Sequence, residues 1–317
     1  MGISQYIKEI GRGKDGARAL SRAQAQDLMS QVLSGSVTDL EVGAFCQSMR
    51  IKGETPEEMA GFLDAVHQQL ATVPHSDAPT VVLPCYNGAR KLPVLTPLLA
   101  LLLAQAGCRV LVHGQTTDPG RVTTHEVLQT WAALFDRPSA RFQSVTSTND
   151  CTEPGRVYFV ATEWLNPGLQ TLLDVRRVIG LRNSAHSMVK LLNPCTSGKS
   201  CLVSSYTHPE YLQSMGAVLK LTHSHALLLR GTEGEPVADP RRAPAIDGFY
   251  QGQQTPLQAQ QAGPLTSLPA LPAGNDPQAT AHYTQALLNG DLPAPPPLSQ
   301  QVALILHHVQ HPNLAAQ

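Results

Sequence analysis

The strongest constraint on the fold is a change in hydrophobic periodicity near residue 80. Before it, apolar residues recur at spacings of three and four, and Ser21, Thr38 and Thr55 stand where helices are expected to begin. After it, short β-rich runs such as 81–83 and 109–112 alternate with helical segments. Such alternation predicts a parallel sheet with helices on its faces. The expected fold class is therefore α/β, with a mostly parallel central sheet behind an all-helical front domain.

The same pattern predicts two domains. We expect a helical domain over residues 1–74, joined by a helix near 167–190, and an α/β domain over residues 80–317. Residues 251–274 are rich in Gln and Pro, carry no charge and show no period, which predicts a long surface loop. Residues 92–106 are almost entirely apolar, but they fall short of the ~20 residues that a membrane-spanning helix needs. They are expected to form a buried helix capped by Thr96, and no membrane partner is predicted.

Overall charge excludes one class of function. The 317 residues include 23 Lys+Arg and 24 Asp+Glu, for a formal net charge of −1. A protein that coats nucleic acid through bulk charge would be strongly basic. Any surface that binds phosphate must therefore be a local concentration of Lys and Arg.

Cysteine and histidine spacings do not predict a metal site. The six cysteines are dispersed without a Cys-x-x-Cys pair, and the N-terminus lacks a signal-peptide pattern, so reduced thiols and a cytoplasmic location are expected. Two histidine pairs, at 223/225 and 307/308, have neither a cysteine nor a third ligand close in sequence. Core or surface histidines are the favoured interpretation of both pairs.

A local concentration of positive charge does occur. Residues 175–209 contain no Asp or Glu, and short Asn, Ser and Thr side chains lie among their cations. Such a surface suits a nucleic-acid backbone, and its binding should weaken as salt rises. The candidate nucleic-acid-binding residues are Arg176, Arg177, Arg182, Lys190 and Lys199, extended by Arg90, Lys91 and Arg121. Each of these side chains is also compatible with an ordinary solvated or ion-paired surface charge.

Four segments carry a family resemblance. Residues 33–39, 49–61, 112–115 and 175–183 resemble the glycosyltransferase family that contains anthranilate phosphoribosyltransferase and pyrimidine nucleoside phosphorylase. The resemblance implies a phosphoribosyltransferase-like fold with a substrate pocket. The positions that correspond to this pocket are Asn87, Gly88, His113, Gly114, Asn166 and Arg176.

Several of the family's functional positions are changed. An active member holds pyrophosphate on a Gly-Thr-Gly-Gly-Asp turn, where this chain has Pro84-Cys85-Tyr86-Asn87-Gly88, and proline has no N–H to donate. Leu95 replaces a serine that assists magnesium, and the metal-binding Asp-Glu pair becomes Glu233 and Glu235 at a different spacing. We therefore predict no catalytic residue, no metal and no cofactor.

These departures, together with residues 182–186 and 231–235, resemble the YbiB-type branch of the family. That resemblance implies a homodimer through the helical domain that binds DNA and RNA with little sequence preference. One alternative is a transferase or phosphorylase with altered substrates, which would use magnesium on Glu233 and Glu235, phosphoribosyl pyrophosphate as donor, and Arg176 for the acceptor. A second alternative is a scaffold whose helical domain serves only dimerisation or partner binding.

Overall fold

The N-terminal part of the chain is helical. The computed structural model describes residues 2–13, 15–136, 141–195, 199–265 and 268–312. Four helices come first: α1 (Ser4–Ile10), α2 (Arg22–Leu33), α3 (Asp39–Lys52) and α4 (Pro56–Gln68). Ser21, Thr38 and Thr55 each cap a helix by accepting the N–H three residues on, and a Gln or Glu there returns the bond. The capping predictions for these three helices are confirmed.

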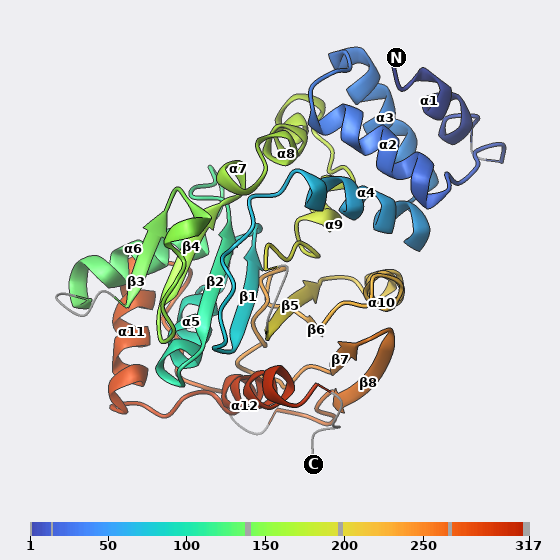
Figure 1. Cartoon of the computed structure of the whole chain (residues 1–317). Helices are drawn as coiled ribbons and strands as arrows, with labels where there is room; N and C mark the ends of the chain where they lie inside the picture. Colours follow the sequence, from blue (N-terminus) through green and yellow to red (C-terminus); the bar gives the residue numbers. More distant parts are fainter. Residues whose placement is uncertain (1, 14, 137–140, 196–198, 266–267, 313–317) are drawn as a thin grey trace.

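Two later helices, α8 (Pro167–Ile179) and α9 (Ala185–Met188), lie beside these four (Figure 1). Buried leucines of α8, Leu169, Leu172 and Leu173, belong to the same apolar cluster as Phe45 and Phe62 of the front helices. That cluster continues into one face of the sheet. The helical part is therefore packed on the α/β part through a shared core.

An eight-stranded sheet forms the centre of the α/β part. Its spatial order is β3-β4-β2-β1-β5-β6-β7-β8, with β7 and β8 antiparallel to their neighbours and the others parallel. The strands are β1 (Thr80–Cys85), β2 (Arg109–Gly114), β3 (Phe142–Val145), β4 (Val157–Ala161), β5 (Ser200–Tyr206), β6 (Ala226–Arg230), β7 (Ile246–Tyr250) and β8 (Gln253–Gln258). The fold-class prediction is confirmed.

Helices cover both faces of the sheet (Figure 1). The further elements are α5 (Thr96–Gln105), α6 (Thr124–Phe135), η1 (Thr148–Asp150), α7 (Thr162–Leu165), α10 (Glu210–Leu221), α11 (Pro277–Asn289) and α12 (Pro296–Gln310). The leucines of α5 lie in the core with α11 and α12, so the buried-helix prediction is confirmed. Within the described residues, no helix has the length and apolar character needed to cross a membrane.

Two local expectations were wrong. Strand β8 lies inside residues 251–274, which were expected to be loop throughout. It is held by backbone pairing to β7, and an edge strand of Gln and Thr carries no hydrophobic period that would reveal it. Thr96 is the first residue of α5 and does not cap it, because the capping position is Leu95, which offers no side-chain acceptor.

Candidate anion-binding site

The candidate site lies at the carboxyl ends of the central strands. Strand β1 has β2 on one side and β5 on the other, so the direction of strand addition reverses there. In open α/β sheets, ligands bind in the crevice outside the carboxyl ends of strands at such a reversal. The segments that follow β1, β2 and β6 and the turn between α8 and α9 meet at this edge.

Two glutamates from the turn after β6 bind the main chain of the loop after β1. Glu233 accepts the main-chain N–H groups of Arg90, Lys91 and Leu92, at 2.7, 3.0 and 2.8 Å. Glu235 accepts the N–H of Gly88 at 2.7 Å and the hydroxyl of Thr124 at 2.8 Å. The two carboxylates therefore occupy four main-chain N–H groups of this loop.

The 231–235 turn, which carries both glutamates, has an unusual backbone conformation. Glu233 has a positive φ of 52°, which is unusual for a residue with a side chain, and Gly234 follows with φ 91°. Burial raises the pKa of Glu233, but the three N–H donors outweigh burial and leave the pKa below its usual value. Glu235 is 1% exposed.

These contacts do not fit a magnesium site. Magnesium requires oxygen ligands that are free to point at the ion. Both oxygens of Glu233 and both oxygens of Glu235 already accept hydrogen bonds from the protein. Leu95 is buried and its side chain adds no oxygen.

Arginines converge on the same loop from three directions. Arg182 donates to the side-chain oxygen of Asn87 at 3.1 Å, and Arg121 donates to the carbonyl oxygen of Gly88 at 3.1 Å. Burial raises the pKa of Tyr86, and the adjacent guanidinium of Arg176 opposes that rise. Three residues predicted from sequence therefore meet around residues 86–88.

These guanidinium groups repel one another. Burial lowers the pKa of Arg182, and the positive charges of Arg176 and Arg121 lower it further. Burial likewise lowers the pKa of Arg121, followed by the charge of Arg90. Within the described ranges, the arginines in ion pairs are others: Arg12, Arg22, Arg141, Arg156, Arg177 and Arg241. Among the described residues, the convergent arginines thus make no ion pair, although the charges of Asp118 and Glu233 act on Arg121 from farther away.

A cleft of about 420 Å³ opens beside this cluster, between the helical part and the sheet. Arg50, Arg182 and Lys190 line it, together with the aromatic rings of Tyr206 and Tyr211. Glu54 and Glu210 also reach its wall. The cleft combines cations, polar groups and aromatic surface, which are the chemical features of a site for a phosphate-bearing ligand.

Lys190 lies at the floor of this cleft. Its ammonium donates to the main-chain oxygens of Ser205 at 3.0 Å and Gly234 at 2.9 Å. Burial lowers its pKa to about 8, although the charge of Glu235 acts in the opposite direction. Its positive charge is therefore only partly compensated at neutral pH.

Comparisons with known proteins show which family the chain belongs to. Residues 4–69 match the helical bundle domain of the glycosyl transferase family. The YbiB protein of Escherichia coli K12, described as uncharacterized, is 37% identical over 308 residues, which cover 96% of this chain and 94% of that protein. The chain belongs to the YbiB family.

More distant relatives share the fold. An anthranilate phosphoribosyltransferase of Symbiobacterium thermophilum is 28% identical over 73% of this chain and 65% of its own length. The crystal structure of the corresponding Thermus thermophilus enzyme superposes with a TM-score of 0.66 at 20% identity, covering 94% of this chain and 86% of that one. This YbiB-family chain therefore has the anthranilate phosphoribosyltransferase fold.

Other predicted residues lie apart from the cluster or serve the scaffold of this YbiB-family protein. Arg177 is 65% exposed and pairs with Asp174 on its own helix. Lys199 precedes β5, so it lies at the amino end of the sheet, opposite the cleft. Asn166 caps α8 by accepting the N–H of Leu169. The loop that carries Arg90 and Lys91 is exposed beside the cluster.

His113 and Gly114 end β2 beneath the cleft. Burial lowers the pKa of His113 to about 4, and its Nε2 lies 3.0 Å from the carbonyl oxygen of Leu192. A side chain on Gly114 would collide with the main chain of Cys85. Both residues therefore serve packing and internal hydrogen bonding.

Sequence reasoning missed two contributors to the cluster. Arg50, near the end of α3, lies close enough to His186 to act on its titration. His186 itself lies 3.3 Å from the hydroxyl of Tyr86, and burial followed by the charge of Arg182 lowers its pKa to about 3. Arg50 lies in a segment that carried the family resemblance, but nothing in its spacing indicated that α3 faces the cleft.

Proposed function

We propose that this protein binds the phosphate backbone of DNA and RNA, with little sequence preference, in the cleft between its helical part and its sheet. The observation that carries the proposal is the convergence of Arg121, Arg176 and Arg182, none of which forms an ion pair within the described part of the chain. Unpaired arginines that are partly withdrawn from water are costly, and a bound phosphate would offset that cost. Arginine also contacts phosphate through two N–H groups at once.

Two features favour an extended ligand over a single pyrophosphate group. The N–H groups of Gly88 and of residues 90–92 are occupied by Glu235 and Glu233, so a compact anion would have to displace these carboxylates. The remaining cations are spread over several positions: Arg50, Arg182 and Lys190 line the cleft, and Arg90 lies in the exposed loop beside the cluster. Cations at several positions can contact more than one phosphate of a strand.

The alternative is a transferase that uses magnesium on Glu233 and Glu235. It requires both carboxylates to leave their present hydrogen-bond donors before an ion binds. We therefore propose that this chain does not transfer phosphoribosyl groups, although other proteins with this fold do so.

The test is fluorescence anisotropy with single- and double-stranded DNA and RNA of several sequences, across a salt series. The double variant Arg176→Ala/Arg182→Ala should bind at least tenfold more weakly in low salt. Its slope of log affinity against log salt should fall by about 2 for duplex DNA, because each lost phosphate contact contributes about 0.9.

A double variant is the matched control for the loss of charge. Lys199→Ala/Arg156→Ala also removes two cations, both at the amino end of the sheet, and should leave affinity unchanged. Equal losses in the two double variants would reject the cleft. Saturable calorimetric heat with phosphoribosyl pyrophosphate and magnesium, lost in Glu235→Gln, would favour the transferase.

We also propose that two copies pair through the helical part. Apolar side chains are unusually exposed there: Leu40 is 83% exposed and Ile51 63% on α3, and Val178 is 86% exposed on α8. A second copy of this chain would cover them. Sedimentation of the wild type as a dimer and of Leu40→Glu/Val178→Glu as a monomer would support the pairing, whereas a monomeric wild type would refute it.

A further inference from the structure

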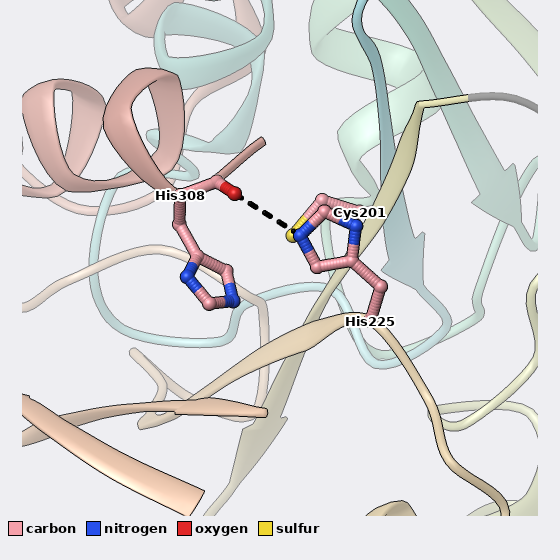
Figure 2. Close-up of side chains that lie close together, drawn as sticks. All are labelled: Cys201, His225 and His308. Atoms are coloured by element: carbon pink, nitrogen blue, oxygen red, sulfur yellow. Dashed lines mark hydrogen bonds between the residues drawn. The ribbon is translucent and has the colours of Figure 1, made fainter. Parts of the chain in front are cut away.

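A second group of chemically reactive side chains lies at the opposite end of the sheet from the cleft. Cys201 is the second residue of β5, His225 immediately precedes β6, and His308 belongs to the last turn of α12 (Figure 2). The three residues are distant in sequence, and the parallel pairing of β5 with β6 brings them together under α12. None of them takes part in the proposed nucleic-acid site.

Their ligand atoms form a compact set. One thiol sulfur and two imidazole nitrogens all lie within 4.8 Å of one another. Cys201 is 0% exposed and His308 is 2% exposed. Nitrogen and thiolate ligands of zinc lie at about 2.0–2.3 Å from the ion, which places them roughly 3.3–3.7 Å from each other. Side-chain movements of about 1 Å would therefore close the set around an ion.

The hydrogen bonding of His308 indicates an incomplete site. Neither of its ring nitrogens makes a hydrogen bond of acceptable length and angle, although the ring is buried and main-chain groups of Phe249 and Ala226 lie near it. Buried polar atoms without partners are rare and costly, and an unrecorded ion is one of their ordinary explanations. Gly248 leaves room for this ring, since a Cβ there would lie 2.9 Å from it.

One present contact of His225 would change on metal binding. Its Nε2 donates to the main-chain oxygen of His308 at 3.1 Å, and a nitrogen that carries this proton does not bind an ion. Binding through Nε2 would therefore replace this hydrogen bond with a bond to the ion.

We propose that Cys201, His225 and His308 bind one divalent transition-metal ion of the zinc type, with a fourth position left to solvent or a main-chain oxygen. One thiolate and two imidazoles favour zinc over magnesium or calcium, which prefer oxygen. The ion would fasten the C-terminal helix α12 to β5 and β6. Its role is structural, because the site is buried and lies away from the cleft.

The test uses the full-length reduced protein and Co²⁺ as a spectroscopic substitute for Zn²⁺. The wild type should develop visible absorption of tetrahedral cobalt and a thiolate-to-cobalt band at one equivalent, and Zn²⁺ should abolish both. Cys201→Ser should lose the thiolate band, and His308→Ala should bind at least tenfold more weakly. Cys46→Ser and His307→Ala change a buried cysteine and the adjacent histidine of α12, and both should behave like the wild type.

A second measurement needs no variant, in case the substitutions prevent folding. X-ray absorption of the zinc-loaded wild type should fit one sulfur and two imidazole ligands. An all-oxygen and nitrogen shell, the absence of cobalt absorption in the wild type, or an unchanged thiolate band in Cys201→Ser would each overturn the proposal.

Discussion

Replacing Glu235 tests directly whether the niche after β1 is filled by the chain's own carboxylate. The side chain is 1% exposed, accepts hydrogen bonds from Gly88 and Thr124, and opposes the burial-induced drop in the pKa of Lys190. The substitution Glu235→Ala leaves the N–H of Gly88 and the hydroxyl of Thr124 without their acceptor, and it leaves the buried ammonium of Lys190 without this compensating charge. We expect the folded state to lose stability while the cleft outside the niche keeps its cations.

The magnitude follows from the contacts. Each hydrogen bond to a charged acceptor contributes about 1.5–3 kcal/mol, and removing one partner of a buried charged pair costs about 3–5 kcal/mol. We take 3–5 kcal/mol as the estimate for Glu235→Ala, on the order of the two hydrogen bonds together. A chain of 317 residues unfolds with an entropy of about 0.7 kcal/mol/K, so the Tm should fall by about 4–7 °C.

Differential scanning calorimetry measures this shift, with two comparison variants. Glu235→Gln keeps one acceptor oxygen and loses the charge, so it should lose about half as much stability. Glu163→Ala removes an exposed carboxylate of α7 and should change stability by no more than about 0.5 kcal/mol. A Tm for Glu235→Ala equal to that of Glu163→Ala would refute the filled-niche interpretation, because a carboxylate waiting for magnesium would contribute little to stability.

Two other predictions concern the cleft and the helical part. The pKa of Lys190 is lowered to about 8, and a bound phosphate stabilises the protonated ammonium, so nucleic-acid affinity should be greatest below pH 8 and fall as pH rises through that value. Anisotropy at constant ionic strength should show this fall in affinity in the wild type but not in Lys190→Gln. Glu235, Arg182, Arg121 and Cys85 also act on the Lys190 ammonium. An equal fall in both proteins would assign the pH dependence to another group. In the helical part, a Cβ on Gly61 would collide with the Arg22 carbonyl and lie 2.9 Å from the Ala25 side chain, so Gly61→Ala should cost about 1–3 kcal/mol in urea unfolding. Gly43→Ala is the matched helical control: its Cβ meets nothing within 4 Å and should gain up to about 1 kcal/mol, and equal effects of the two changes would contradict the close approach of α2 and α4.

Much of the fold was predictable because its determinants are local. Ser21, Thr38 and Thr55 cap helices through residues only three positions away, and this spacing is visible in the sequence. The alternation after residue 80 likewise indicated a parallel sheet. Strand β8 was not predictable, because its pairing with β7 depends on backbone bonds and its polar side chains carry no periodic signal.

The candidate site was predictable only in part. The sequence identified an acid-free basic segment, but its five cations do not share one environment. Arg176 and Arg182 face the loop after β1, Arg177 turns to Asp174, and Lys199 lies at the far end of the sheet. The phase of a helix and the direction of a strand decide which way each side chain points, even for residues that are neighbours in sequence. Counting charges along the chain therefore does not show which cations face the cleft.

The sequence by itself determined the order of elements, the helix ends and the loss of the glycine-rich turn after β1, since each depends on residues within a few positions of one another. Only the tertiary structure decided that Glu233 and Glu235 fill that niche, that Arg121 joins Arg176 and Arg182, and that Cys201, His225 and His308 meet under α12. These contacts join residues separated by tens to more than a hundred positions. Their proximity is set by the sheet order and the packing of helices on its faces, which no local pattern specifies.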